Sequence, residues 1–332
     1  MALDPYLQTV SHKVPILQVF AHRVRTGQLA YNGNSIRARS AEDYLRSVAQ
    51  TFLGMGADNP RLNSAGDIDF RLKRMIAAWK KKDPPPNRVK PVPVQVIRRI
   101  SIIARHSTCN ITIAVSDMII LAFFFLLRPG EYTDSPSDTT PFCLQDIQLF
   151  VGDRCLNLTT ASDAQILAAC FGALTFTDQK NGVRGEVVGL ACSGDPYLCP
   201  VHAIGRRIIH LRRHGAPPNT PLARVYVTPT LISSVTPSLI TTALRQAVTF
   251  LGPELGFNPK DVSARCLRAA GANALLLAKI DTNVIQLIGR WRSDEMLRYL
   301  HVQARPLMKD FSRKMLAAGQ YTLIPNQLVP QH

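Results

Sequence analysis

The chain has 332 residues, of which 46% are hydrophobic and 19% charged, which is typical of a globular protein with two domains and a sizeable core. Its 39 Lys and Arg residues exceed its 23 Asp and Glu residues, and the net charge of +16 favours a nucleic-acid partner over a merely basic protein or one bound to an anionic membrane. The longest apolar run, Met118–Leu127, is shorter than the about 20 residues that cross a bilayer, so it predicts a buried helix and no membrane span.

The cysteines predict a reduced, intracellular protein. There are seven of them, no CxxC pair occurs and no signal peptide opens the chain, which is typical of free thiols rather than of a disulfide scaffold. Cys192, Cys199 and His202, together with His210 or His214, are conceivable metal ligands. Their spacing matches no zinc module that we recognise, so we expect no metal site.

The first 94 residues predict a small helical domain. Residues 40–56 offer Ser40 as a helix N-cap, followed by an apolar face made of Tyr44, Leu45, Val48 and Phe52. Residues 69–82 predict a second amphipathic helix, whose basic side ends in three candidate DNA contacts, Lys80, Lys81 and Lys82. This part carries roughly +8, about half of the net charge, which would suit a clamp on the backbone of duplex DNA.

A proline-rich segment predicts the domain boundary. The stretch "KKKDPPPNRVKPVPVQV" has five prolines between Pro84 and Pro93, and proline at this density stops helices and forms an extended connector. We therefore expect a linker over residues 83–94, a first domain over 1–94 and a second over 95–332.

For the second domain, the sequence predicts helices, then a small antiparallel sheet, then helices again. Residues 94–107 and 116–134 have helical patterns, and the latter helix is expected to stop at Pro129-Gly130. Two hairpins follow, one around Gly152-Asp153 and one around Asn181-Gly182, a favoured turn pair. After residue 199 the pattern is helical. The fold class is therefore α+β and mostly helical.

One of the later helices has a basic face. The stretch "CPVHAIGRRIIHLRRHG" carries four arginines that we expect near DNA, although a solvated face is the alternative: Arg206, Arg207, Arg212 and Arg213.

Several polar residues lie in otherwise apolar contexts. Arg128 ends an apolar helix and is followed by Glu131, and Lys180 lies at the tip of the second hairpin. Further along, Arg265 and Arg268 stand three positions apart and are expected to share one helix face. The remaining two are Arg290 and Tyr299, nine residues apart.

This set of residue types suits phosphoryl transfer. A phosphodiester gains negative charge on its non-bridging oxygens in the transition state, and the fixed guanidinium fork of arginine stabilises that charge. A lysine on a hairpin can protonate the leaving 5′ oxygen, and a tyrosine hydroxyl can attack phosphorus and hold the strand covalently.

Four blocks of sequence carry a resemblance to a known family. They are "FLLRPGE", "DQKNGVRGE", "RCLRAAGANALL" and "LIGRWRSDEMLRYLH", and they occur in this order behind a basic helical domain. Together they resemble the tyrosine recombinase (phage integrase) family, and look closest to the recombinases of Crypton and DIRS-type mobile elements. The resemblance covers roughly Ile16 to Leu316.

The resemblance implies a fold and a set of roles. It implies an N-terminal helical core-binding (SAM-like) domain and a C-terminal catalytic domain. Arg128 matches the first catalytic arginine, Glu131 its supporting carboxylate and Lys180 the hairpin lysine. Arg268 matches the arginine of the HxxR motif, and Tyr299 matches the nucleophile.

Two positions depart from the family pattern. Arg265 replaces the HxxR histidine, and because an arginine side chain stays protonated at neutral pH it cannot deprotonate Tyr299, although it can bind phosphate. Arg290 takes the later His/Trp position and can replace an imidazole or indole N–H as a donor. Trp291, one place on, suits packing better than catalysis.

The resemblance implies a site-specific DNA recombinase or integrase that cuts and rejoins double-stranded DNA through a 3′-phosphotyrosyl intermediate. It implies a homotetramer on two duplexes, no cofactor, no metal and, in a eukaryote, a nuclear location. Two alternatives stay open: a non-catalytic DNA-binding relic, which the change at Arg265 favours, and a relaxing enzyme similar to type IB topoisomerases. Each residue also has an ordinary structural interpretation, such as core packing for Tyr299 and a solvated turn for Lys180.

Overall fold

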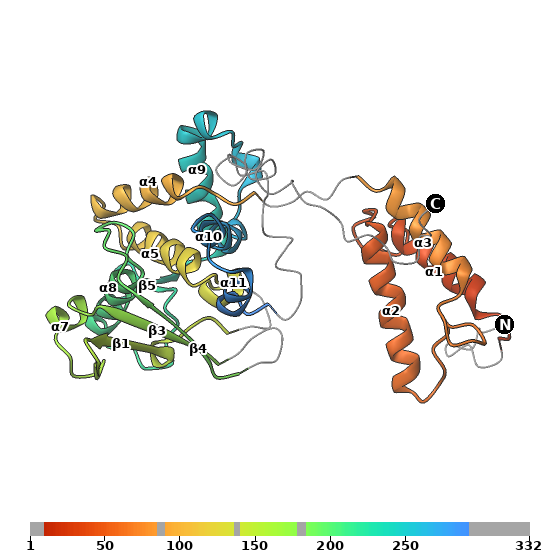
Figure 1. The fold of residues 1–332 in the computed structure, drawn as a ribbon, viewed down its shortest axis with the longest axis horizontal. Coiled ribbons are helices and arrows are strands. Elements are labelled where there is room, and N and C mark those ends of the chain that lie inside the picture. The colour runs from red at the N-terminus through yellow and green to blue at the C-terminus, as the bar shows by residue number, and fades with distance from the viewer. Residues whose placement is uncertain (1–9, 85–89, 136–139, 178–183, 292–332) are drawn as a thin grey trace, which may run out of the picture. The chain divides into compact units, whose positions relative to one another are not determined.

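The computed structural model describes residues 10–84, 90–135, 140–177 and 184–291. The chain divides into two compact units, Met1–Asn87 and Arg88–His332 (Figure 1). Each unit has its own hydrophobic core, and each is described separately below.

The first unit is helical, as predicted. Its helices are α1 (Lys13–Arg25), α2 (Ala38–Gly54) and α3 (Phe70–Lys82). Their apolar faces meet in a core that contains Leu17, Leu45 and Leu72. The helices bury these side chains because each is amphipathic, with apolar residues three and four positions apart.

The start of α2 differs from the prediction. The helix begins at Ala38 rather than after Ser40, and Tyr44 of the predicted apolar face is 53% exposed. The reason is a cap from far along the chain: Asp83 accepts a hydrogen bond from the backbone N–H of Ala38 at 2.7 Å and pairs with Arg25 at 2.8 Å. The contact with Arg25 lowers the pKa of Asp83, so the capping carboxylate stays charged.

The second unit combines helices with a small sheet, as predicted (Figure 1). Its longer helices are α4 (Val94–Arg105), α5 (Asn110–Phe124), α8 (Pro200–Arg213), α9 (Pro237–Leu255) and α10 (Cys266–Leu277). Its shorter helices are α6 (Pro129–Tyr132), α7 (Asp163–Leu167), α11 (Thr282–Ile288) and the 3₁₀ turns Leu144–Asp146 and Pro259–Asp261. The apolar run of the sequence lies in α5, where residues 114–123 are all buried, as expected for a central helix.

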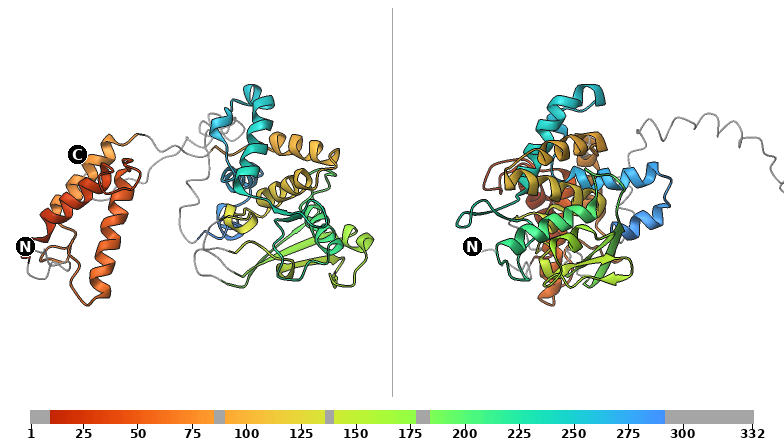
Figure 2. Two further views of the ribbon diagram at one scale, coloured as in Figure 1. Left: turned by 180° about the vertical axis from the view of Figure 1, so that it is seen from behind. Right: turned by 90° about the vertical axis from the view of Figure 1, so that its left-hand side faces the viewer.

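The sheet has four antiparallel strands in the order β2-β1-β3-β4. These are β1 (Ile147–Val151), β2 (Arg154–Cys155), β3 (Phe171–Phe176) and β4 (Glu186–Ala191). Phe150 pairs with Cys155, which places Gly152-Asp153 in the turn and confirms the first hairpin. Pairing of β3 with β4 confirms the second, and its predicted turn at residues 178–183 lies outside the described residues. Helix α8 packs on β3, and the two views of Figure 2 show it beside the sheet.

A second, smaller sheet was not predicted. It pairs β5 (Arg224–Tyr226) with β6 (Ile232–Ser234), in a region where the sequence was expected to be wholly helical. Three residues per strand are too few for the alternation of polar and apolar residues to show in the sequence. In the part of the chain that the structure describes, no helix has the length and apolar character of a membrane span.

The end of α5 also differs from the prediction. The helix stops at Phe124 and not at Pro129, which instead begins α6. Leu126 adopts φ +51°, and the N–H of Leu127 donates to the carbonyl of Ala122 at 3.1 Å. This is a Schellman motif with leucine in the place where glycine is usual. A left-handed conformation costs a leucine about 1–2 kcal/mol, so the surrounding structure must hold this turn in place.

Candidate functional site

Arg128 and Glu131 form the outer part of the candidate site. Arg128 precedes α6, and its backbone N–H donates to Glu131 Oε2 at 2.7 Å while its side-chain Nη1 donates to Oε1 at 2.9 Å. The Glu131 side chain is 3% exposed, whereas that of Arg128 is 28% exposed. Glu131 therefore fixes the orientation of a guanidinium that still reaches the surface.

Arg290 reaches the same carboxylate from the other side. Its Nη2 donates to Glu131 Oε2 at 3.0 Å, and its Nη1 donates to the carbonyl of Ile288 at 3.0 Å. The guanidinium also lies 3.6 Å from the ring centre of Phe176, a cation–π contact. Burial lowers the pKa of Arg290 to about 10, against the opposing effect of Glu131, so the side chain remains a cation at neutral pH.

Arg290 occupies the same kind of turn as Leu126. It adopts φ +56°, and the N–H of Trp291 donates to the carbonyl of Gln286 at 3.0 Å, which makes a Schellman motif at the end of α11. Helix α11 is capped by Gly289, but the left-handed residue is Arg290 and not the glycine. Two helix ends with unusual left-handed residues thus meet at one place.

Arg268 ties these two turns together. It projects from α10, is 3% exposed, and donates from Nη1 to the carbonyl of Leu126 at 2.5 Å and from Nη2 to the carbonyl of Gly289. Arg290 Nη2 also contacts the Leu126 carbonyl, at 3.4 Å. The left-handed turn of Leu126 therefore presents one carbonyl oxygen to two arginines, which offsets the cost of the conformation.

Arg265 lies at the N-terminus of the same helix but differs from Arg268 in burial. It is the N-cap residue of α10 and is exposed, whereas Arg268 is buried. The described residues thus bring together three predicted arginines, Arg128, Arg268 and Arg290, around Glu131 and the Leu126 turn. Of the four arginines Arg128, Arg265, Arg268 and Arg290, the two that reach the surface are Arg128 and Arg265.

Trp291 packs at the inner side of this site. It is buried in a small cluster with Leu126, Ala272 and Ile285, and Arg268 stacks over its ring at 4.1 Å. A Cβ atom at Gly289 would come within 1.6 Å of the Trp291 ring, so only glycine fits there. These contacts accord with a packing role for Trp291.

Two further predicted site residues lie outside the described residues. Lys180 belongs to the segment 178–183 between β3 and β4, and Tyr299 belongs to the segment 292–332 that follows Trp291. Their roles stay predictions.

The small residues Ala269, Ala270, Gly271 and Ala272 predict that other backbone approaches this helix closely, and Gly271 is where α10 meets α5. A Cβ at this position would lie 2.1 Å from the carbonyl oxygen of Phe123 and 2.4 Å from a methyl carbon of Leu126. We expect Gly271→Ala to push α10 away from the Leu126 turn and to lower the free energy of unfolding by about 1–3 kcal/mol, the usual cost of overpacking. Urea denaturation followed by circular dichroism measures this loss.

Gly54→Ala is the matched control for that experiment. Gly54 ends α2 in the first unit, and no atom lies within 4 Å of the Cβ that it would gain. The control should unfold at the wild-type urea concentration or slightly above it, because alanine favours a helix more than glycine does. Equal stability of Gly271→Ala and wild type would show that the close approach of the two helices is not a constraint.

The four arginines predicted along α8 have different environments. Arg206 pairs with the buried Asp117, Arg212 donates to the carbonyl of Ala161 at 2.7 Å, and Arg213 is exposed beside Asp163. Arg207 corrects the prediction, because it is 1% exposed and donates to the carbonyls of Leu222 and Arg224. Its burial lowers its pKa to about 10 and removes it from any surface that contacts DNA.

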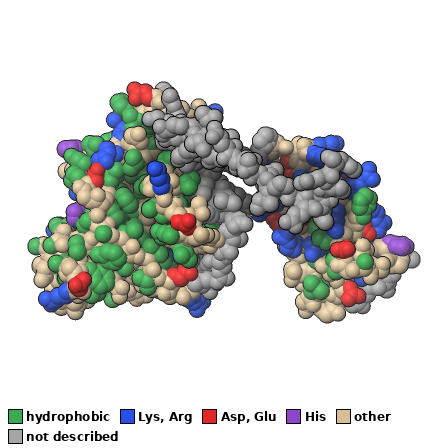
Figure 3. Space-filling model, viewed as in Figure 1, with side chains coloured by type: hydrophobic (Ala, Val, Ile, Leu, Met, Phe, Trp, Pro, Cys, Tyr) green, Lys and Arg blue, Asp and Glu red, His purple; other side chains and the backbone are tan. Residues whose placement is uncertain are grey.

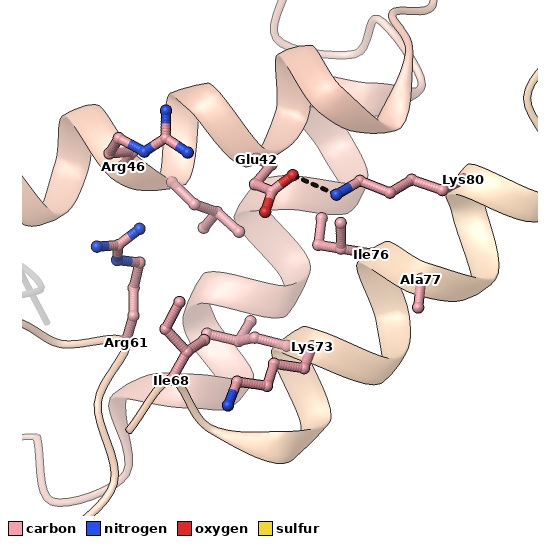
Figure 4. A pocket seen from close by; sticks show the side chains of 10 residues that line it. Glu42, Arg46, Arg61, Ile68, Lys73, Ile76, Ala77 and Lys80 are labelled. Atoms are coloured by element: carbon pink, nitrogen blue, oxygen red, sulfur yellow. Dashed lines mark ion pairs between the residues drawn. The ribbon is translucent and has the colours of Figure 1, made fainter. Parts of the chain in front are cut away.

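The first unit has a basic pocket that includes one of the predicted lysines. The pocket has a volume of about 330 Å³ and lies between α2, α3 and the segment that joins them (Figure 4). Lys80 pairs there with Glu42 at 2.7 Å, while three further cationic side chains line it: Arg46, Arg61 and Lys73. Lys81 and Lys82 follow Lys80 at the end of α3.

Sequence reasoning missed the other cations of this pocket. Burial lowers the pKa of Arg61, and the nearby cation Arg46 lowers it further. The spacing of seven residues between Lys73 and Lys80 was the available signal, because it places both on one face of α3.

Comparisons with known proteins give the fold a context. No protein-family model and no curated protein sequence matches the chain. Among solved structures, the integrase of the Tn1549 transposon in complex with transposon right end DNA is 14% identical, with 93% of this chain and 86% of that chain covered and a TM-score of 0.51. The XerH site-specific recombinase bound to a palindromic difH substrate is also 14% identical, with 92% and 73% covered and a TM-score of 0.50.

These likenesses concern the fold. At 14% identity they establish that the chain has the two-domain fold of the tyrosine recombinases, with a helical N-terminal part and a mostly helical C-terminal part that contains a small antiparallel sheet.

Proposed function

We propose that the chain is a site-specific DNA recombinase of the tyrosine recombinase class, which cuts and rejoins double-stranded DNA, as in DNA integration. The observation that carries the proposal is the arrangement around Glu131. This buried carboxylate holds Arg128 at 2.9 Å and Arg290 at 3.0 Å, and Arg268 lies on the carbonyl that Arg290 also contacts. Distant segments thus bring together the arginines that the family resemblance had indicated.

The exposed arginines are the groups that would contact the scissile phosphate. Arg128 and Arg265 have surface access, and a guanidinium offers two parallel N–H donors to the non-bridging oxygens as negative charge builds up on them. Arg268 and Arg290 are buried, where they hold the two turns and add positive potential.

The proposed strand transfer uses Tyr299, Lys180 and a 5′ hydroxyl of the partner strand. The Tyr299 oxygen attacks phosphorus, the P–O5′ bond breaks, and Lys180 gives its proton to the departing 5′ oxygen. A 5′ hydroxyl of a partner strand then gives its proton to the neutral Lys180 and attacks phosphorus, which breaks the P–O bond to Tyr299 and releases it. Arg265 cannot accept the tyrosine proton, so we propose that this proton leaves to water and that the positive charge of the site stabilises the phenolate.

The finer features of the proposal rest on the resemblance. We propose a homotetramer on two duplexes, a nuclear location in a eukaryotic cell, and an origin close to Crypton and DIRS-type elements. We also propose that residues 1–94 form the clamp domain, with a linker over residues 83–94. No cofactor takes part in the proposed chemistry.

A non-catalytic DNA-binding protein is the second candidate. The observation that favours it is the engagement of Arg268, whose two terminal nitrogens donate to the carbonyls of Leu126 and Gly289. An arginine that serves two backbone turns has a structural role of its own. Both candidates bind DNA, and only the enzyme forms a covalent intermediate.

DNA binding is expected to depend steeply on salt. A protein of net charge +16 that neutralises about 6–10 phosphates loses roughly 10³–10⁵ in affinity between about 50 and 200 mM salt, because bound counterions are released. Fluorescence anisotropy with a labelled duplex of arbitrary sequence measures this slope. A nearly constant affinity across the range would contradict the proposal.

The variant Lys73→Gln tests whether the basic pocket of the first unit contacts the DNA backbone. Removing one phosphate contact lowers the salt slope by about 1, so Lys73→Gln should lower it by about that amount. Lys260→Gln removes the same charge from an exposed position in the other unit and serves as the control. Equal slopes in the two variants would remove Lys73 from the interface.

A further inference from the structure

Two cysteines and a histidine come together at the end of the sheet opposite to the predicted hairpin turn. Cys192 follows β4, Cys199 is the N-cap residue of α8, and His202 lies in the first turn of that helix. One ligand atom from each of the three lies within 4.8 Å of the others. Cys199 is buried, and the other two are partly buried.

The loop between Cys192 and Cys199 is held in shape by its own hydrogen bonds. Asp195 Oδ1 accepts from the N–H groups of Tyr197 and Leu198 at 2.8 and 3.0 Å, and Ser193 Oγ donates to the carbonyl of Leu198 at 2.8 Å. Arg98 pairs with Asp195 and anchors this loop to α4. The cysteines therefore face each other in a fold that is already organised, which lowers the entropic cost of binding an ion.

We propose that Cys192, Cys199 and His202 bind a zinc ion. Thiolate sulfur and imidazole nitrogen are ligands of zinc, while calcium and magnesium require oxygen. Around a tetrahedral zinc ion with Zn–S of about 2.3 Å and Zn–N of about 2.0 Å, ligand atoms lie about 3.5–3.8 Å apart. The three ligand atoms lie within 4.8 Å of one another, so side-chain shifts of up to about 1 Å would bring them to this spacing.

Cys170 would supply the fourth ligand only after its side chain turns, because its Sγ donates to the carbonyl of Phe150 at 3.5 Å. The N–H of Cys192 donates to the carbonyl of Cys170 at 2.9 Å, which extends the β3–β4 register by one pair beyond Phe171 and Ala191. Directly opposed residues of an antiparallel pair point to the same face of the sheet. Three thiolates and a neutral imidazole would leave the zinc complex with a charge of −1.

The ion would join β4 to α8. The C-x6-C-x2-H spacing is unfamiliar, so no metal site was expected from it. In the structure, the six-residue loop folds back and brings Cys199 next to Cys192. The site is separate from Arg128, Glu131 and Arg290, and the proposal does not depend on the proposed function.

Metal titration of the full chain tests the site. The reduced protein, stripped with a chelator, should bind one equivalent of Zn²⁺ and should unfold at a higher temperature when loaded. Co²⁺ in place of Zn²⁺ should give the absorption of a tetrahedral thiolate complex. Cys192→Ser and His202→Asn should each lose this spectrum and the thermal shift, and circular dichroism checks that they fold.

Control variants show whether zinc binding depends on the proposed ligands. Cys155→Ser and His106→Asn change a cysteine and a histidine elsewhere and should bind one equivalent like wild type. Cys170→Ser should bind more weakly and change the cobalt spectrum; an unchanged spectrum would remove Cys170 from the site. Absence of stoichiometric binding by the wild type, wild-type binding by Cys192→Ser, or a Cys192–Cys199 disulfide that persists under reducing conditions would overturn the proposal.

Discussion

Replacing Tyr299 with phenylalanine should abolish formation of a covalent DNA–protein adduct while leaving duplex binding nearly unchanged. The change removes one oxygen, and this oxygen is the atom that is proposed to attack phosphorus. Loss of the nucleophile leaves no second route to the adduct, so the expected effect is complete. Loss of one hydroxyl costs only about 1 kcal/mol in stability, so the fold should persist.

The measurement uses a nicked suicide duplex that carries candidate element ends. Wild-type protein should yield a species that survives SDS and maps to Tyr299 by mass spectrometry. Tyr321→Phe is the matched control, because it makes the same chemical change in the same C-terminal part of the chain and should retain the adduct. An adduct formed by Tyr299→Phe would refute the assignment. Absence of any adduct from the wild type would favour the non-catalytic DNA-binding protein.

The second large effect is expected at Glu131. Glu131→Gln keeps the shape of the side chain but removes the charge that Arg128 and Arg290 share. The Arg290 side chain is 1% exposed, so it would remain as a buried cation without a counter-charge. Breaking a buried ion pair in this way costs about 3–5 kcal/mol, and we expect a loss of this size in the free energy of unfolding of the second unit.

Urea denaturation measures this loss, and two further variants interpret it. Glu254→Gln makes the same change at an exposed position of α9 and should alter stability by less than about 0.5 kcal/mol. The double variant Glu131→Leu with Arg290→Met replaces the buried pair by apolar groups and should recover much of the stability. The double variant should not form the covalent DNA–protein adduct, because its Arg128 lacks the carboxylate that orients the guanidinium. Wild-type stability of Glu131→Gln would show that the pair is not needed for folding.

Much of the architecture could be predicted from the sequence because it depends on local patterns. The helices α3, α4 and α8 follow apolar residues at helical spacing, and the two hairpins follow alternating residues on either side of a turn. The true start of α2 could not be predicted, because the residue that caps it, Asp83, is 45 positions away. The end of α5 could not be predicted either, since Leu126 stands where the local rule expects glycine.

The candidate site, too, could be predicted in part. Its arginines stood out in the sequence because each interrupts an apolar stretch, and their identities suggested phosphate chemistry. Their burial could not be predicted, since a sequence does not show which arginines donate to backbone carbonyls. Arg207 and Arg268 both do so, yet one was assigned to DNA and the other to catalysis. The small residues around Gly271 indicated a close approach of backbone, but its partner α5 could not be predicted because it precedes Gly271 by more than 140 residues.

The position of Trp291 has a practical consequence for spectroscopy. The chain has two tryptophans, and each unit contains one: Trp79, with Arg25 at 5.1 Å from its ring, and Trp291, with Arg268 at 4.1 Å. Each unit therefore has its own intrinsic fluorophore. In a Trp79→Phe protein, all tryptophan emission comes from Trp291. Its ring lies beside Arg268 and fills the space left by the missing side chain of Gly289. Its emission maximum then reports water entry at the arginine turns, and stopped-flow mixing with DNA can time any opening there without an attached dye.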